Sequence, residues 1–257
     1  MIMREILEKF KNGLISFEEA ETKLKLNYFD EVEDFCKIDT NRKLRTGIPE
    51  VVYAEGKRLE DVVKILKKLA VKNGTALATR IKDIEELKKY FEDDTELILE
   101  INELGRTATL RLPNYTINKT EKIGILAAGT SDIPVAEEAF ESAKLIGCEV
   151  IKNYDVGIAG IHRLFNPIKK MIEEDVCCII VVAGMEGALP SVVSSLVDIP
   201  VIGVPTSVGY GFKMTPLFTM LHSCSPGLVV VNMDNGFGAG VFAGLIASNI
   251  SKRIKKG

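Results

Sequence analysis

The fold is decided by Val176-Cys-Cys-Ile-Ile-Val-Val182, which is apolar at every position, and by Gly184-Met-Glu-Gly-Ala-Leu-Pro190 just after it. A strand that is apolar on both faces is typical of the middle of a parallel sheet that helices cover on both sides. The Gly-rich segment is typical of the turn from a strand into a helix. We therefore expect a buried central strand here, with Cys177 and Cys178 as core side chains.

The same alternation of strand and helix extends outward on both sides of this segment. Apolar runs occur at 123–128, 149–153, 176–182, 200–204 and 228–233, and they alternate with helical patterns near 133–146, 164–173, 187–197, 213–222 and 238–252. Strict alternation of this kind predicts a parallel sheet with right-handed crossovers. Residues 119–257 are therefore expected to form an α/β domain with a three-layer, doubly wound sheet.

Residues 1–118 predict a smaller amino-terminal α/β domain. It should begin with a helical hairpin over residues 2–26, whose second helix opens with the capping box of Ser16 and Glu19. Arg42 and Arg45 are expected to flank a turn. The remaining patterns are helical at 59–69 and near 82–91, and strand-like at 51–54, 76–79, 96–101 and 107–112. The polar segment 113–120 is the expected linker between the domains.

Composition excludes several classes of partner. The 257 residues are 46% hydrophobic and 27% charged, with a net charge of −3, so no basic field attracts nucleic acid or an anionic membrane. No apolar run approaches the roughly 18 residues of a membrane span, and the charged first residues are unlike a signal peptide. The five cysteines contain no CxxC pair, which fits a reducing compartment. We expect a cytoplasmic protein that binds neither nucleic acid nor membranes.

Five Gly-rich loops follow the expected strands of the larger domain. Ligands of an open parallel sheet bind beyond the carboxyl ends of its strands, where glycines let the backbone approach and helix N–H groups favour phosphate. Five such loops together predict a nucleotide pocket. The loops cover 129–132, 157–163, 184–190, 203–211 and 234–240. The substrate-binding candidates among them are Gly129, Thr130, Ser131, Arg163, Gly184, Met185, Gly187, Asp234, Asn235 and Gly236.

Titratable side chains in these loops supply candidates for catalysis. Asp132 either caps the helix that begins near Pro134 or takes part in the chemistry. His162 and Arg163 end the second strand as a titratable base and a phosphate fork. Of the two histidines, His222 is expected to end a helix.

Cys224 stands apart from the other cysteines because it lies in a loop, Ser223-Cys-Ser-Pro-Gly227. An exposed thiol near cations or helix ends can ionise and act as a nucleophile. The alternative is an inert small residue in a turn. Cys148, like Cys177 and Cys178, is expected to serve packing.

The motifs of the larger domain resemble a known family. The ordered set 129–132, 159–163, 183–190 and 235–240 is similar to the purine-biosynthesis carboxylase/mutase that handles carboxyaminoimidazole ribonucleotide, the AIR carboxylase type, whose fold is flavodoxin-like. The resemblance covers about residues 122–253. That family has an Ala-Ala-His-Leu-Pro segment whose histidine shuttles a proton, whereas Ala188 stands at its position here. This departure argues against the purine reaction.

The whole chain resembles the pyridinium-3,5-biscarboxylic acid mononucleotide synthase family, which begins assembly of the nickel-pincer nucleotide cofactor of lactate racemase. The motifs that carry the resemblance are Arg45-Thr-Gly-Ile-Pro-Glu-Val-Val-Tyr-Ala-Glu-Gly-Lys57 and, further along, segments 154–163, 184–190, 223–227 and 232–238. The resemblance implies that nicotinic acid adenine dinucleotide is carboxylated with CO2 or bicarbonate and its phosphoanhydride hydrolysed, releasing AMP. It also implies Mg2+ and a homo-oligomer, from dimer to octamer.

The implied chemistry assigns roles to the candidate residues. The Cys224 thiolate would add to the electron-poor pyridinium ring and make it nucleophilic toward CO2. Glu186, Asp132 or His162 would then remove the ring proton, with Glu186 favoured by its loop. The phosphoanhydride needs cations, for which Arg163, Arg42, Arg45 and Lys57 are available. The alternatives are a mutase or carboxylase of the purine type and a non-catalytic adenine-nucleotide sensor.

Overall fold

A computed structural model describes residues 2–26, 30–32 and 36–254. The larger domain holds a five-stranded sheet in the order β11-β10-β9-β7-β8. Every pair of neighbouring strands is parallel. This is the flavodoxin-like, doubly wound order expected from the sequence. The strands are β7 (Lys122–Ala127), β8 (Glu149–Asn153), β9 (Ile179–Ala183), β10 (Val201–Pro205) and β11 (Leu228–Val230).

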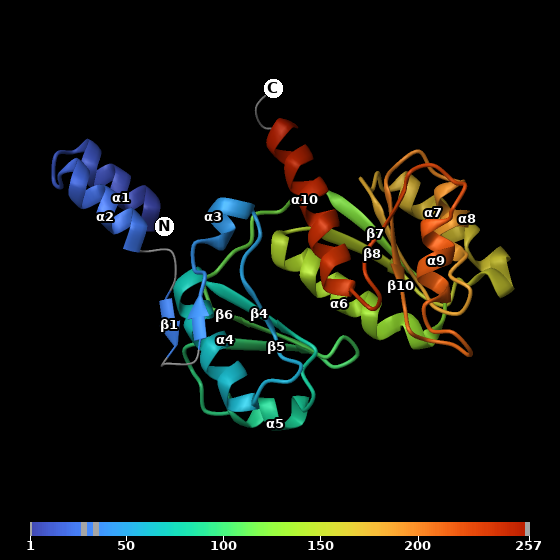
Figure 1. The fold of residues 1–257 in the computed structure, drawn as a ribbon, viewed down its shortest axis with the longest axis horizontal. Coiled ribbons are helices and arrows are strands. Elements are labelled where there is room, and N and C mark those ends of the chain that lie inside the picture. The colour runs from blue at the N-terminus through green and yellow to red at the C-terminus, as the bar shows by residue number, and fades with distance from the viewer. Residues whose placement is uncertain (1, 27–29, 33–35, 255–257) are drawn as a thin grey trace.

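Helices cover both faces of this sheet, which gives the three layers (Figure 1). On one face lie α6 (Ile133–Ile146) and α10 (Gly236–Ile254), and their buried alanines let the two helices approach closely. A Cβ added at Gly240 would lie 2.3 Å from the Ala139 carbonyl oxygen, so only glycine fits there. The other face carries α7 (Phe165–Glu173), α8 (Leu189–Ser194) and α9 (Thr215–Leu221).

The two edges of this sheet differ from the expected bounds. Strand β11 ends at Val230 rather than near residue 233, because only Val201, Ile202 and Gly203 of β10 pair with it. Strand β9 begins at Ile179, three residues later than the apolar run that predicts it. Its residues are all buried, as are Cys178 and Cys148, whereas Cys177 is half-buried.

The amino-terminal domain has a mixed four-stranded sheet in the order β3-β4-β6-β5. Only the β3–β4 pair is parallel. Strand β4 is buried at every position because α4 contacts it and α6 of the larger domain lies against it too. Its elements are β3 (Val51–Tyr53), α4 (Leu59–Asn73), β4 (Thr75–Thr79), α5 (Ile84–Lys89), β5 (Ile98–Asn102) and β6 (Thr107–Arg111).

The first part of the chain forms the expected helical hairpin, α1 (Ile2–Lys11) and α2 (Phe17–Leu26). Both hydrogen bonds of the capping box are present, with Ser16 and Glu19 exchanging them at 3.0 and 3.1 Å. A small antiparallel pair follows, β1 (Asp30–Val32) with β2 (Cys36–Ile38). The prediction of a turn between Arg42 and Arg45 is wrong, because both residues lie in a short helix, α3 (Arg42–Thr46). This helix ends at Gly47, whose φ is 78°.

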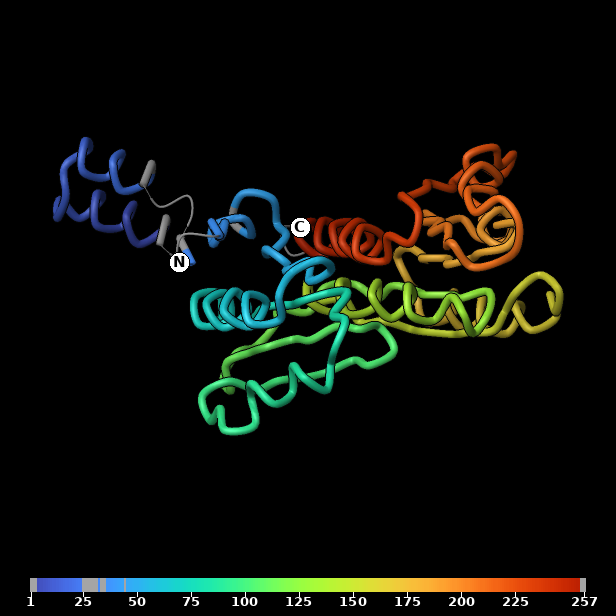
Figure 2. The backbone as a smooth tube through the Cα atoms, turned by 60° about the horizontal axis from the view of Figure 1, so that its bottom comes forward, coloured from blue at the N-terminus to red at the C-terminus, as the bar shows by residue number. Residues whose placement is uncertain are grey.

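The two sheets meet across helix α6 (Figure 2). This helix turns three buried glutamates toward the contact, Glu137, Glu138 and Glu141. Buried carboxylates require partners, and Glu137 receives hydrogen bonds from Lys152 (2.7 Å), Tyr154 (2.5 Å) and Asn102 (2.6 Å). Asn102 belongs to β5 and also donates to Glu141 at 3.1 Å. The domains are therefore joined by polar contacts centred on α6.

Candidate functional site

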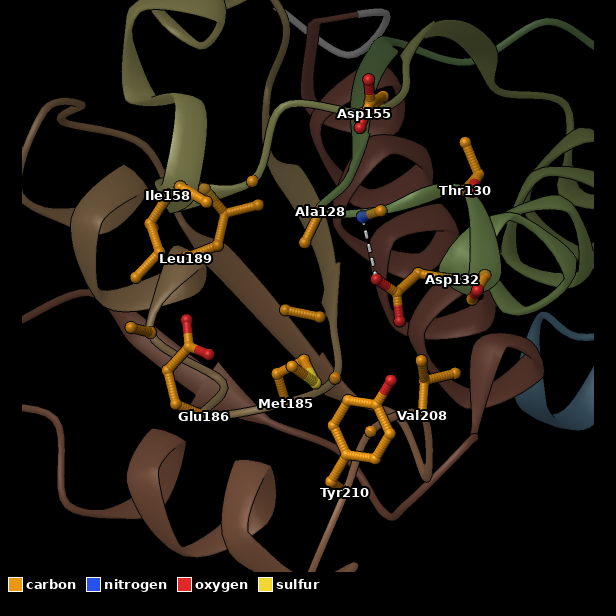
Figure 3. Close-up of a pocket in the computed structure, with 18 residues that line it drawn as sticks. Ala128, Thr130, Asp132, Asp155, Ile158, Met185, Glu186, Leu189, Val208 and Tyr210 are labelled. Atoms are coloured by element: carbon orange, nitrogen blue, oxygen red, sulfur yellow. Dashed lines mark hydrogen bonds between the residues drawn. The ribbon is translucent and has the colours of Figure 1, made fainter.

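A cavity of about 610 Å³ lies at the carboxyl ends of β7, β8, β9 and β10 (Figure 3). Strand β7 has β8 on one side and β9 on the other. This is the position where the strand order reverses, and ligands of doubly wound sheets bind there. The cavity is lined by residues 128–132, 155 and 157–159, 183–186 and 188–189, and 208–210. It is the site that the Gly-rich loops predict.

Asp132 joins three strand ends beneath this cavity. Its carboxylate accepts hydrogen bonds from the Gly129 N–H at 2.9 Å, the Thr206 hydroxyl at 2.6 Å and the Gly184 N–H. The side chain is only 4% exposed. It makes no side-chain capping hydrogen bond to α6 itself, but its bond from the Gly129 N–H forms part of a capping box at the 3-10 turn Thr130–Asp132, which leads into α6. Burial raises the pKa of Asp132 above its ordinary value, against the opposing effect of its three donors.

The 184–189 loop places Glu186 at the cavity. Met185, with φ of 51°, donates its N–H to the Val208 carbonyl at 2.8 Å and so ties this loop to the next. Gly187 has φ of 69°, and a Cβ there would lie 2.6 Å from Pro216 Cα, so the loop requires glycine. Figure 3 shows the Glu186 carboxylate directed into the space between the loops. It makes no hydrogen bond or ion pair within the described residues.

Three carboxylates line the cavity, namely Asp132, Asp155 and Glu186. None of the 18 lining residues, all of them in the described chain, is Lys, Arg or His. The field inside the cavity therefore favours a cationic group over an anionic one. Cationic side chains for the phosphate oxygens of a nucleotide must come from outside this lining.

Asp155 is a lining residue that sequence reasoning missed. It follows β8 with φ of 58° and forms an ion pair with Arg163. The sequence feature that could have identified Asp155 is its position just after the second strand of the larger domain. Arg163 thus stands one contact away from the cavity, at the end of the 3-10 helix η2 (Ile158–Arg163), where its Nε donates to the Gly160 carbonyl. His162 is exposed and does not line the cavity.

Val208 and Tyr210 are two further lining residues that were not singled out. Their loop is Gly-rich in the sequence, but only the fold shows that it bends over the cavity. Tyr210 is 93% exposed, and its ring stands at the cavity edge beside Met185 and Val208 (Figure 3). A large aromatic ring exposed at a cavity edge is suited to stacking on a planar ligand.

Asp234, Asn235 and Gly236, which the sequence predicted to bind substrate, are not among the residues that line the cavity. Asp234 Oδ1 accepts the Ser207 N–H at 2.8 Å, and Asn235 Oδ1 accepts the Gly238 N–H at 2.7 Å at the start of α10. A Cβ at Gly236 would lie 2.2 Å from the Val135 carbonyl oxygen, so this glycine permits the packing of α10 on α6. Asp234 therefore supports the loop after β10, whereas Asn235 and Gly236 shape the start of α10.

The three cations expected from the amino-terminal domain do not reach the cavity of their own chain. Arg45 pairs with Asp39 at 2.5 Å, and Lys57 donates to the Tyr53 carbonyl at 2.7 Å. Arg42 begins α3. Arg80, an amino-terminal cation that the sequence did not single out, instead donates to the Asp234 carbonyl next to the loop that follows β10.

Cys224 is exposed, as expected for a reactive thiol, but it does not line the cavity. Its loop precedes β11, and the Gly227 carbonyl accepts a hydrogen bond from Val201, the first residue of β10, at 3.0 Å. Cys224 is thus at the amino edge of the sheet, whereas the cavity is at the carboxyl edge. The intervening strand β10 has five residues, roughly 16 Å in length. Burial raises the pKa of Cys148 to about 11, which leaves that thiol unreactive.

No cluster of three His, Cys, Asp or Glu side chains that would hold a metal occurs among the described residues. The lining does not form a magnesium cage. Single carboxylates combined with substrate phosphates are the arrangement that Mg2+ commonly uses, and only that arrangement fits here. Within the described chain, no helix combines the length and the apolar character needed to span a membrane.

A flavodoxin-like sheet with a carboxylate-lined cavity at its switch point defines the class of doubly wound domains that bind a ligand beyond the carboxyl ends of their strands. Comparison with known proteins agrees. Residues 122–257 match the model of AIR carboxylase, and residues 29–112 match that of the LarB/PurE-like N-terminal domain. The chain belongs to the AIR carboxylase family, in the two-domain arrangement of LarB. It is a carboxylase-type enzyme.

Relatives fall into two groups. An uncharacterized protein of Methanocaldococcus jannaschii is 59% identical over 97% of this chain and 98% of its own length. The N5-carboxyaminoimidazole ribonucleotide mutase of Thermotoga maritima is 29% identical over 52% of this chain and 82% of that protein. The mutase of M. jannaschii is 31% identical over 51% and 85%, respectively. The mutases therefore correspond to about half of this chain.

Proposed function

We propose that this protein carboxylates the pyridinium ring of nicotinic acid adenine dinucleotide and hydrolyses its phosphoanhydride. The products are pyridinium-3,5-biscarboxylic acid mononucleotide and AMP. The observation that carries the proposal is the cavity at the β7–β9 switch point, which has three carboxylates and Ala188 where the purine enzymes have their histidine. The two-domain arrangement supports it.

The charge of the cavity favours a pyridinium substrate. The ring carries a positive charge, and the cavity is lined by the carboxyl groups of Asp132, Asp155 and Glu186, of which Asp155 is paired with Arg163. An aminoimidazole ribonucleotide has no such fixed cation. Tyr210 offers a ring face on which a planar heterocycle can stack.

The reaction divides into two covalent steps. The Cys224 sulfur donates an electron pair to a ring carbon, and the resulting dihydropyridine attacks CO2 with its enamine carbon. Glu186 then accepts the proton from that carbon, the electron pair restores the aromatic ring, and the C–S bond breaks. Glu186 suits this role because its carboxylate points into the cavity and has no partner in the described chain. Asp132 is less suited because both of its oxygens accept hydrogen bonds.

The proposal includes a site shared with a second copy of the chain. Cys224 lies at the opposite edge of the sheet from its own cavity, which supports an attacking thiol from a neighbouring protomer. Arg42, Arg45 and Lys57 lie outside the cavity as well, and cations for the phosphoanhydride can arrive in the same way or as Mg2+ carried on phosphate oxygens. Exposed apolar side chains on α9, Phe218 and Leu221, lie close to Cys224 in sequence and offer a surface for such a neighbour.

The decisive experiment is mass spectrometry of small molecules after the reduced protein has been incubated with nicotinic acid adenine dinucleotide, bicarbonate and Mg2+. Appearance of AMP with a mononucleotide one carboxyl group heavier than nicotinate mononucleotide supports the proposal. Intact dinucleotide under these conditions contradicts it.

A second candidate is a mutase or carboxylase of the purine type, favoured by the 29–31% identity to the mutases over the larger domain. Conversion of a carboxyaminoimidazole ribonucleotide, with no requirement for Cys224, would identify it. Binding of adenine nucleotides without turnover of either substrate would identify a nucleotide sensor.

A further inference from the structure

Arg80 of the amino-terminal domain contacts the Asp234 turn, which is bonded to a loop of the cavity. It follows β4 in the left-handed region, with φ of 57°. Its guanidinium binds Glu138 of α6 at 3.2 Å and donates to the Asp234 carbonyl oxygen, while Glu55 lies 3.7 Å away. A positive φ costs a residue other than glycine about 1 kcal/mol or more. The hydrogen bonds of the Arg80 guanidinium therefore stabilise this conformation.

The Asp234 carbonyl belongs to the turn that supports the cavity loop of β10. Asp234 also has positive φ, 54°, and its N–H donates to the Pro205 carbonyl at 2.8 Å. Its Oδ1 accepts the Ser207 N–H at 2.8 Å. The turn is thus bonded to the β10 loop on both sides of Thr206, and Arg80 holds the turn from outside.

The loop that this turn supports carries two contacts of the cavity. Thr206 donates to Asp132, and the Val208 carbonyl accepts the Met185 N–H. Val208, Gly209 and Tyr210 line the cavity directly. A path of three contacts therefore leads from Arg80 to the loop and onward to Asp132.

We propose that Arg80 is a positioning residue: by holding the Asp234 carbonyl it fixes the 206–210 loop, and so places an amino-terminal residue in control of the geometry of the cavity. This is distinct from adhesion between the domains. Asn102 joins the same domains through Glu137 and Glu141 but has no contact with the turn or the loop. The kinetic consequences of the role of Arg80 rest on the proposed function, whereas the structural consequences do not.

Arg80→Lys and Asn102→Ala form a matched pair of variants. Lysine at position 80 keeps a positive charge for Glu138 but lacks the fork that reaches Glu138 and Asp234 together. Hydrogen exchange of the free protein is measured by mass spectrometry on peptides covering 204–212 and 230–238. We expect Arg80→Lys to speed hydrogen exchange in both peptides about tenfold, which corresponds to the loss of roughly one charged hydrogen bond. The exchange rate of β9 should stay unchanged. Asn102→Ala should leave both peptides as in the wild type.

Asp234→Gly provides a second way to loosen the 206–210 loop. Glycine adopts the positive φ without strain, but it removes the carboxylate oxygen that accepts the Ser207 N–H. Its effect on 204–212 should match that of Arg80→Lys, and the double variant should add little. With the dinucleotide as substrate, Arg80→Lys should raise KM about tenfold and change kcat less than about twofold. The proposal is overturned if the Arg80→Lys variant keeps the wild-type hydrogen-exchange rate in peptide 204–212. It is also overturned if Asn102→Ala changes that rate as much as Arg80→Lys does. A wild type without carboxylation would contradict the proposed function, while the exchange comparison would still decide the role of Arg80.

Discussion

The hydroxyl of Thr206 donates a hydrogen bond of 2.6 Å to Asp132 Oδ1 and joins the ends of β10 and β7 beneath the cavity. Both side chains are buried, Thr206 completely and Asp132 nearly so. The two residues are far apart in the chain and belong to two different loops that line the same cavity.

Replacement of Thr206 by valine should remove this bond at nearly constant volume. Because the bond lowers the pKa of Asp132, its loss should raise that pKa further above the ordinary value. We expect a loss of about 1 kcal/mol in the free energy of unfolding, measured in urea. Any activity that needs ionised Asp132 should shift to higher pH. A Thr206→Ser variant, which keeps the hydroxyl, should restore the pH profile, and failure to do so would argue against the bond.

Asp132→Asn tests the cost of the buried carboxylate. Burial raises the folded pKa of Asp132 above the value of 3.8 that an unperturbed group has. The folded state therefore binds the proton more tightly, and the stability from this group is fully present below that value and lost as pH rises through the folded pKa. The wild type should gain stability relative to the variant on acidification from pH 7 to 4. Parallel stability curves for the two proteins would contradict the raised pKa.

Cys224→Ser and Glu186→Gln test the shared site together. Each variant alone should fold and lose at least about a hundredfold in carboxylation, since one lacks the nucleophile and the other the base. Mixed oligomers, formed by co-expression, should regain part of the activity because some sites combine an intact cavity with an intact thiol. Cys36→Ser serves as the control and should stay active. No recovery in proven mixed oligomers would place Cys224 and Glu186 in a site built by one protomer.

Tyr210→Ala should weaken nucleotide binding by removing the ring at the edge of the cavity. Stacking of an aromatic side chain on a heterocycle contributes about 1 kcal/mol, so KM for the dinucleotide should rise about fivefold. Tyr210→Phe keeps the ring and should behave as the wild type. The exposure of 93% makes an effect on folding small, and equal KM values for the alanine and phenylalanine variants would rule out stacking.

Glu137→Gln probes the contact between the domains. Burial tends to raise the pKa of Glu137, but hydrogen bonds from Lys152, Tyr154 and Asn102 outweigh it and hold the pKa below the ordinary 4.5. The stability from this group is therefore present above pH 4.5 and lost as pH falls through the folded pKa. The variant should be about 1 kcal/mol less stable at pH 7, and the difference should shrink toward pH 3. A difference that stays constant over this range would show that charge is unimportant here.

The sequence predicted the larger domain well because its helices and strands are marked by local patterns of apolar residues and by glycines at their ends. The apolar run at Val176–Val182 made a central strand recognisable, and Gly147 ended α6 at the expected residue. Loop glycines such as Gly187 marked the turns that later proved to line or support the cavity. Arg42 and Arg45 were misread because a helix of five residues has too short a pattern to be distinguished from a turn.

By itself, the sequence determined the succession of strands and helices, the parallel sheet and the edge of that sheet where a ligand binds, because these follow from local periodicity and from rules of chain connection. The flavodoxin-like strand order was implied by the family resemblance. The sequence also supplied the motifs that identify the family. Only the tertiary structure decided which loops share one cavity, that Asp155 and Tyr210 line it, that Cys224 lies at the opposite edge, and that Arg80 reaches the Asp234 turn. These relationships depend on distances between residues far apart in the chain, and such distances are set by the packing of the sheets on α6 rather than by any local pattern.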